Sequence, residues 1–173
     1  MGFITELDYQ FDIDKILEVT DQCSHLPQTT LNNRGDNLSM EEQLICGSGG
    51  LQKWYEIKTY EDIKDKDFHW HKLNDFFIDT YIEELYNKIQ KDWQVGRSRV
   101  MNLHPSVCYS YHYDFSKRIH IPLVTNENCK FFDKDWNVYH LEVGKTYVVD
   151  TTQFHTTGNF GKEIRTHIVM AIK

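Results

Sequence analysis

The stretch "YHYDFSKRIHIPL", residues 111–123, alternates in a way that an ordinary protein core does not explain. Successive residues of a strand point to opposite faces, so residues i and i+2 share a face. One face then collects apolar and aromatic side chains, namely Tyr111, Tyr113, Ile119, Ile121 and Leu123. The other face collects ionisable side chains, namely His112, Asp114, Arg118 and His120. We expect the first face to pack against the rest of the protein and the second to line a polar cavity.

The ionisable face needs a partner, because burying unpaired charged groups costs several kcal/mol. His112 and Asp114 share a face and can present an imidazole and a carboxylate to one divalent metal ion. His155, which follows a strand and a turn in "GKTYVVDTTQFHTTGN" (144–159), is the expected third ligand. Two histidines and one carboxylate occupy one face of an octahedron and leave three positions open, an arrangement typical of non-haem ferrous oxygenases.

An arginine opens the last apolar run of the chain, "EIRTHIVMAI" (163–172). If Arg165 is buried near the metal, it needs a carboxylate partner. A bidentate clamp on a dicarboxylate cosubstrate is the simplest interpretation. His167 shares a face with Arg165, so it either lines the same cavity or packs in the core.

Short runs rich in Val, Ile, Tyr and Thr follow Gly96 and are separated by turn residues. The predicted strands are 97–103, 106–113, 118–124, 129–132, 137–141, 145–149, 154–157 and 164–172. So many short strands in so little chain predict a mainly β fold, a sandwich or jelly roll.

The first half of the chain reads as helical and rich in loops. The strongest helix signal is 74–93, where Phe77, Tyr81, Leu85, Ile89 and Trp93 recur at i+4 steps. Asn74 is the expected N-cap of this helix. We expect the helix to cover an outer face of the sheet against Tyr109, Tyr111 and Tyr113. A short helix is predicted for 12–24 and a polar loop for 29–50, which together with Trp54–Tyr55 would form a rim over the pocket.

Chain length, net charge and cysteine content limit the class of protein. The chain has 173 residues, a length that predicts one domain (1–173), in which 1–96 cover the sheet and rim the pocket and 97–173 form the β core. A net charge of −7 without a basic run argues against binding to nucleic acid or to a membrane surface. The four cysteines show no C-x-x-C pairing and the N-terminus has no secretory pattern, so we expect a reducing cytoplasm.

The motifs His112-Tyr113-Asp114, Arg118-Ile119-His120-Ile121-Pro122-Leu123, Gly144-Lys145 through Asp150 to His155, and Arg165 resemble a known family. They are similar to the aspartyl/asparaginyl β-hydroxylase branch of the 2-oxoglutarate-dependent oxygenases, and also to the small proline hydroxylases. The resemblance covers about 97–172 and implies a double-stranded β-helix, cupin-like, with N-terminal helices packed on its outer face.

The resemblance also implies roles for individual residues. Fe(II) would be held by His112, Asp114 and His155. 2-Oxoglutarate would be held by Arg165 with help from His120, and Arg118 would hold a carboxylate or an amide of the substrate. The expected activity is hydroxylation of an amino acid, free or within a peptide or protein. The expected partner is thus a small-molecule or peptide substrate, with ascorbate as a possible reductant.

Two other functions compete with this hypothesis. A non-catalytic jelly-roll module with a structural metal would have a closed site, usually of four protein ligands. A cupin-like metal-binding protein or metalloenzyme that does not use 2-oxoglutarate would have no need of Arg165. His69-Trp70-His71 has the H-x-H spacing of a cupin-type metal site, although it precedes the predicted helix rather than a β pattern, which favours an aromatic contact at the helix entry.

Overall fold

The computed structural model describes residues 2–26, 28–35, 37–45 and 64–173. The chain divides into two compact units. The first comprises Met1–Ile13 and Met101–Val169, and the second comprises Asp14–Val100 and Met170–Lys173. The last part of the loop predicted for 29–50 (residues 46–50) and the predicted rim residues Trp54–Tyr55 lie outside the described residues.

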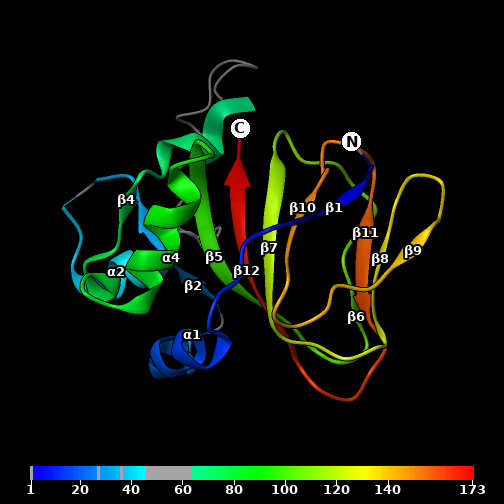
Figure 1. Cartoon of the computed structure of the whole chain (residues 1–173), viewed down its shortest axis with the longest axis horizontal. Coiled ribbons are helices and arrows are strands. Elements are labelled where there is room, and N and C mark those ends of the chain that lie inside the picture. The colour runs from blue at the N-terminus through cyan, green and yellow to red at the C-terminus, as the bar shows by residue number, and fades with distance from the viewer. Residues whose placement is uncertain (1, 27, 36, 46–63) are drawn as a thin grey trace. The chain divides into compact units, whose positions relative to one another are not determined.

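The first unit contains two groups of antiparallel strands (Figure 1). In the larger sheet, β1 (Ile4–Leu7), β10 (Thr146–Val149), β7 (Lys117–Val124) and β12 (Arg165–Ile172) are neighbours in that order. β10 pairs with both β1 and β7 in antiparallel register. The second sheet has the order β6 (Val107–Cys108), β11 (Thr156–Asn159), β8 (Cys129–Phe132) and β9 (Val138–Tyr139).

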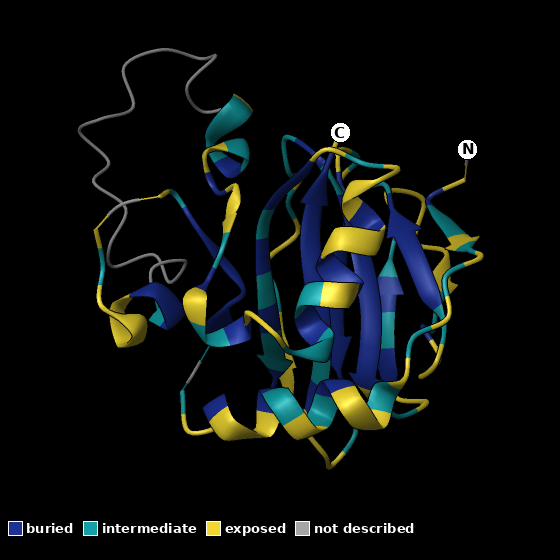
Figure 2. Cartoon of the chain, turned by 60° about the vertical axis from the view of Figure 1, so that its left-hand side comes forward, coloured by how far each residue is buried: buried dark blue, intermediate teal, exposed yellow. Residues whose placement is uncertain are grey.

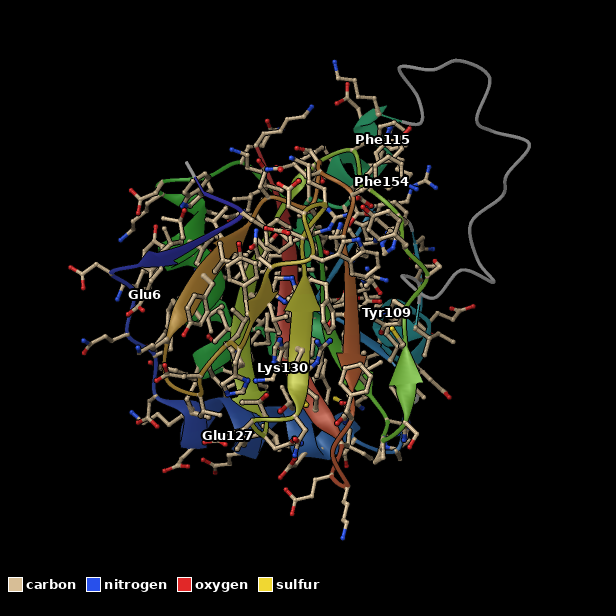
Figure 3. All side chains as sticks on the ribbon, turned by 90° about the vertical axis from the view of Figure 1, so that its right-hand side faces the viewer. Glu6, Tyr109, Phe115, Glu127, Lys130 and Phe154 are labelled. Carbon is tan, nitrogen blue, oxygen red and sulfur yellow. The ribbon has the colours of Figure 1, made fainter. Side chains whose placement is uncertain are left out.

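An apolar cluster joins the two sheets of the first unit. It contains Phe131 from β8 and Tyr147 and Val149 from β10, together with Phe3 and Leu141. Figure 3 looks onto the four-stranded sheet, with strands of the larger sheet behind it. The inner faces of the two sheets therefore form the core of this unit, as in a jelly roll.

The register of β7 places ionisable side chains on this inner face. His120 stands opposite Tyr147, and Arg118 stands opposite Val149. Directly opposed residues of an antiparallel pair share a face, so Arg118 and His120 point toward the inter-sheet core. The alternate residues of β7 are also buried: Ile119, Ile121 and Leu123. Burial of this apolar face confirms the prediction for 119–123.

The second unit holds the helices and several short strands. Its elements are α1 (Ile13–Thr20), η1 (Asp21–Cys23), β2 (Thr29–Thr30), β3 (Asn32–Asn33), α2 (Met40–Ile45), η4 (Lys66–His69), β4 (Lys72–Leu73), η5 (Asp75–Phe77), α4 (Tyr81–Gln90) and most of β5 (Val95–Leu103). α1 and η1 confirm the helix predicted for 12–24. The long helices present one buried and one exposed side (Figure 2).

The helix predicted for 74–93 is shorter and begins later. Asp79 has a positive φ of 60°, which interrupts the helical path after η5. Thr80 is the N-cap of α4, and its hydroxyl accepts from the Ile82 amide. Asn74 does not cap a helix with its side chain; its amide instead donates to the Thr30 carbonyl. The i+4 pattern was right for Leu85 and Ile89, which are buried in α4.

Two other predictions need correction. The segment 29–50 was expected to be a loop, but its described part contains β2, β3 and α2, and Leu31 and Asn32 are fully buried. The segment 106–113 was expected to be one strand, but only Val107–Cys108 form one. Beyond it the chain is irregular, and Tyr111 and Tyr113 are 45% and 49% exposed rather than packed in a core. The period-2 pattern there arises from alternating surface aromatics and inward polar residues.

The remaining predicted strands after Gly96 are observed within a few residues. β5, β7, β8, β9, β10, β11 and β12 all fall on predicted runs. The fold is mainly β with antiparallel sheets, as expected for a jelly roll. Among the described residues, none of the helices has the length and apolar character that a membrane crossing requires.

Candidate metal centre

The three predicted metal ligands lie close together in the first unit. His112, Asp114 and His155 each offer one ligand atom, and these atoms lie within 4.8 Å of one another. His112 and Asp114 lie in the irregular segment after β6, and His155 is the residue immediately before β11. His155 is 5% exposed, whereas His112 and Asp114 are half-buried. The cluster therefore faces partly inward and is accessible from one side.

Backbone hydrogen bonds fix the two ligand-bearing segments against each other. The His112 amide donates to the His155 carbonyl at 3.0 Å, and the His155 amide donates back at 2.8 Å. The Asp114 amide donates to the Thr151 carbonyl at 2.8 Å. The Thr151 hydroxyl donates to the Ser116 carbonyl at 2.7 Å. These bonds determine the separation of the ligands before any ion binds.

The two histidines are oriented in the same way. Nδ1 of His112 lies 2.6 Å from the Ser110 carbonyl oxygen, and Nδ1 of His155 lies 2.9 Å from the Gln153 carbonyl oxygen. Because a carbonyl oxygen can only accept, each Nδ1 carries the proton in the neutral ring. The lone pair is then on Nε2, which is the atom left to bind a metal. A backbone acceptor behind a ligating imidazole is the usual arrangement in metal sites.

Arg118 lies next to the carboxylate of the cluster. Its guanidinium is 3.3 Å from an Asp114 carboxylate oxygen and donates to the Ser116 hydroxyl at 2.6 Å. The Arg118 side chain is 7% exposed and the Asp114 side chain is 30% exposed, so water reaches the carboxylate end of this ion pair. The predicted contact of Arg118 with a substrate carboxylate or amide stays a prediction.

Arg165 is deeply buried, with only 2% of its surface exposed. Its guanidinium donates to the Thr157 hydroxyl at 2.8 Å and lies 5.3 Å above the Phe131 ring. Its Nε has no hydrogen-bond partner among the described residues. No carboxylate in the described part of the chain forms an ion pair with it. Burial lowers the pKa of Arg165 to about 10, which leaves a buried cation at neutral pH.

Two buried histidines lie beside this arginine. Nδ1 of His120 is 3.4 Å from Nδ1 of His167, and both rings contact Phe131. The Nε2 atom of His167 has no partner among the described residues. Burial, reinforced by Arg165, lowers the pKa of both histidines well below the usual value. Both rings are therefore neutral at physiological pH.

Burial also lowers the pKa of His155, and the neighbouring His112 acts in the same direction. A neutral imidazole is the form that binds a metal, because the proton and the ion compete for one lone pair. The electrostatics of the site thus favour the ligand form of His155 at neutral pH.

Other cysteine and histidine side chains lie outside the cluster of ligands. Cys108 is exposed, with Sγ 3.4 Å from the Thr156 hydroxyl. His104 is exposed, and His140 is half-buried against the Cys129 carbonyl. His71 contacts the carbonyl of His69, and this pair is not among the possible metal-binding groups of the described residues.

Three residues that contact the buried arginines of the site were not identified from the sequence. Thr157 holds Arg165, Ser116 holds Arg118, and Phe131 lies against the buried guanidinium of Arg165. Thr157 could have been found, because it stands two residues after His155 and so shares its strand face. Phe131 could not, since its approach depends on how the two sheets pack.

A jelly roll that holds a 2-His-1-carboxylate cluster and a buried arginine is the arrangement of the 2-oxoglutarate- and Fe(II)-dependent oxygenases. The sequence agrees with this class. Residues 53–173 match the model of the aspartyl/asparaginyl beta-hydroxylase family, and the chain belongs to this family.

Two solved hydroxylase structures are similar to this chain in fold, and a third solved structure aligns with part of it. A viral collagen prolyl hydroxylase from Paramecium Bursaria Chlorella virus-1, solved with 2-oxoglutarate, is 8% identical over 99% of this chain and 96% of that one, with a TM-score of 0.56. A prolyl-4-hydroxylase from Pseudomonas putida is 10% identical over 100% and 93%, with a TM-score of 0.50. A 2OG-Fe(II) oxygenase family protein from Burkholderia pseudomallei is 13% identical with a TM-score of 0.44; the match covers 60% of this chain and 61% of that protein.

Proposed function

We propose that the protein is a dioxygenase that uses Fe(II) and 2-oxoglutarate to hydroxylate an amino acid or an amino-acid residue of a peptide or protein. The family to which the chain belongs uses these cofactors. When bound, Fe(II) and 2-oxoglutarate activate dioxygen and release succinate and CO2 as a C–H bond of the substrate is hydroxylated. The residue roles below are part of the proposal.

The three proposed ligands, His112, Asp114 and His155, fit a divalent ion. Their ligand atoms lie within 4.8 Å of one another, and hydrogen bonds at Nδ1 leave Nε2 of each histidine for the metal. Three protein ligands leave open coordination positions, which a cosubstrate needs. A structural site would more often present four ligands. The donor set therefore favours a catalytic over a structural metal.

The observation that carries the proposal is the buried Arg165. A cation with 2% exposure and no described carboxylate partner requires an anion to offset its desolvation. The distal carboxylate of 2-oxoglutarate is such an anion, and a guanidinium can bind it with two parallel hydrogen bonds. His120 lies next to this cation and completes the proposed cosubstrate site. A cupin-like metalloenzyme without 2-oxoglutarate would leave Arg165 without a function.

The protein contributes positioning and exclusion of water. Arg165 and Thr157 would fix the far end of the cosubstrate, and Phe131 covers the guanidinium. Arg118 pairs with the Asp114 carboxylate and is the proposed contact for a carboxylate or amide of the substrate. Ascorbate as a reductant and a cytoplasmic location complete the proposal.

Succinate formation from 2-oxoglutarate tests this function. Purified protein with Fe(II) and ascorbate is expected to convert 2-oxoglutarate to succinate, and His155→Ala is expected to lower the rate to the background without enzyme. The exposed His104 provides a matched control, and His104→Ala is expected to behave like the wild type.

Calorimetry with Mn(II) distinguishes the loss of a metal-binding side chain from misfolding of the variant. The wild type and His104→Ala are expected to bind one ion, and His155→Ala is expected to bind it far more weakly while it keeps a cooperative thermal transition. Turnover by His155→Ala at the wild-type rate would contradict the assignment of the metal ligands.

A further inference from the structure

Two buried histidines beside Arg165 form a hydrogen bond between identical ring atoms. Nδ1 of His120 lies 3.4 Å from Nδ1 of His167. Both rings are neutral, because burial and the charge of Arg165 lower the pKa of each well below its usual value. A neutral imidazole carries one ring proton, and a hydrogen bond needs one donor and one acceptor. The two rings are therefore opposite tautomers: one carries its proton on Nδ1 and the other on Nε2.

Packing keeps these two nitrogens facing each other. His120 is on β7 and His167 is on the neighbouring strand β12. His120 is 6% exposed and His167 is 1% exposed, so His167 is the more deeply buried of the pair. Phe131 stacks on the His167 ring at a centroid distance of 6.4 Å and lies nearly perpendicular to the His120 ring at 5.2 Å. Close packing of this kind restricts both rings to the observed orientation.

The charge of Arg165 determines which ring donates. Arg165 and His167 are two residues apart on β12 and share a face of the strand. Nε2 of His167 is buried and has no partner among the described residues. A proton on this atom would form an N–H donor without an acceptor, beside a cation that repels it. A bare Nε2 has partial negative charge, which the guanidinium stabilises. The proton of His167 is therefore on Nδ1, which donates to His120.

This donation determines what His120 can offer to a ligand. Because Nδ1 of His120 accepts, the proton of this ring is on Nε2. Nε2–H is a donor, and an ionised carboxylate can only accept. With the tautomers reversed, His120 would present a lone pair to an anion and repel it. The pair thus prepares His120 for an anionic ligand next to Arg165.

We propose that His167 is a positioning residue for the cosubstrate: its Nδ1–H holds the proton of His120 on Nε2, and Nε2–H of His120 donates to a carboxylate of 2-oxoglutarate. This inference rests on the proposed function. His167 itself does not touch the cosubstrate, since its Nε2 is sealed in the core. Substitution of His167 should therefore weaken the binding of 2-oxoglutarate and leave the binding of the metal unchanged.

Nitrogen NMR detects the two tautomers directly. Long-range nitrogen–proton correlation spectra distinguish a protonated from a bare ring nitrogen, and single variants at His120 and His167 assign the signals. The sample is the protein loaded with Zn(II), which is diamagnetic. We expect a proton on Nδ1 of His167 and on Nε2 of His120, before and after 2-oxoglutarate is added. Any other distribution of these two protons overturns the proposal.

Substitution tests the effect on the cosubstrate. In calorimetry with Mn(II)-loaded protein, His167→Leu is expected to bind 2-oxoglutarate about fivefold more weakly, the equivalent of one neutral hydrogen bond. His167→Asn keeps an N–H donor near the position of Nδ1 and is expected to bind within about twofold of the wild type. The exposed His104 supplies the matched control, His104→Leu. Wild-type affinity in His167→Leu contradicts the positioning role, as does equal weakening in a His167→Asn variant that keeps the wild-type thermal transition.

A double-variant cycle shows whether His167 acts through His120. If it does, His120→Leu and the double variant His120→Leu/His167→Leu bind 2-oxoglutarate equally weakly. A further loss of affinity in the double variant would mean that His167 acts independently of His120, and the positioning role would be wrong.

The two proposals fail in different ways. If 2-oxoglutarate does not bind to the Mn(II)-loaded wild type, the proposed function is wrong. If it binds to the wild type and equally well to His167→Leu, only the role of His167 is wrong.

Discussion

Two clusters of buried polar side chains differ in one respect. In the second unit, Asn32, Asn33, Gln43 and Asn74 form an amide cluster in which each side chain has partners. In the first unit, His120, Arg165 and His167 form a cationic cluster in which Nε of Arg165 and Nε2 of His167 have no partner among the described residues. Both clusters are almost completely buried.

The difference separates a structural role from a binding role. Buried polar groups are normally satisfied, because an orphaned group costs about 1–3 kcal/mol. The amide cluster obeys this rule and holds short strands and loops together. The cationic cluster does not obey this rule when no ligand is bound. A bound dicarboxylate would supply the missing hydrogen-bond acceptor of Arg165. The unsatisfied donor of the cationic cluster thus supports the proposal that an anionic ligand binds there.

The largest expected effect follows from removing the buried cation. Arg165→Met is expected to lower kcat/KM for 2-oxoglutarate on the order of 100-fold, because one partner of a buried charge pair is lost. Its thermal stability without ligand should equal or exceed that of the wild type, because an uncompensated buried charge disappears. Steady-state kinetics and thermal unfolding measure the two quantities. Lys162, exposed in the same unit, is the control as Lys162→Met. A large loss of stability in Arg165→Met would mean that Arg165 is structural.

The amide cluster should respond in the opposite way. The Asn32 side chain donates to Trp70, Tyr86 and Gly96, and its oxygen accepts from the Ser98 amide. Asn32→Ala leaves these groups unpaired and is expected to lower the free energy of unfolding by about 3 kcal/mol. Urea unfolding measures this loss.

Adding Fe(II) or 2-oxoglutarate should not restore the free energy of unfolding that Asn32→Ala loses. Asn128 is exposed, so Asn128→Ala is the matched control and is expected to change stability by less than about 0.5 kcal/mol. A wild-type stability for Asn32→Ala would remove the contrast between the two clusters.

The smallest effect concerns pH. Burial and Arg165 lower the pKa of His167, so the folded state keeps this ring neutral while the unfolded chain takes up a proton near pH 6.5. Its contribution to stability is therefore complete above about pH 6.5 and is lost as the pH falls below that value. His167→Asn cannot titrate, and its free energy of unfolding should fall by about 1.4 kcal/mol less than that of the wild type between pH 7.5 and 5.5.

Urea unfolding at the two pH values measures this difference. His104→Asn, at an exposed position, is the control and is expected to follow the wild type. Parallel pH profiles for His167→Asn and the wild type would show that His167 is not held neutral by its surroundings.

Much of the β region could be predicted from the sequence. β7, β8, β10 and β12 are dense in β-branched and aromatic residues and are bounded by turn residues, so local pattern suffices. The irregular segment 110–114 was mistaken for a strand, because alternation of surface rings with inward ligands imitates the strand period. The β strands at 29–33 carry too little apolar pattern to be found; the amide cluster, a long-range feature, stabilises them.

The candidate site was predictable to the same extent. Histidine and carboxylate spacing indicated His112, Asp114 and His155, and the structure brings their ligand atoms together. Arg165 and His120 were also placed beside the inner face. Arg118 pairs with Asp114, a contact four residues along the chain that strand periodicity does not anticipate, and its expected contact with a substrate stays a prediction.

The reciprocal amide bonds between His112 and His155 have a practical consequence. Backbone hydrogen bonds already hold both imidazoles in place. The fold therefore does not depend on a bound metal ion. Chelators should strip it and leave a folded protein, which can be refilled with a redox-inert ion such as Mn(II) under air. Trapped complexes with candidate peptides could then be crystallised without turnover.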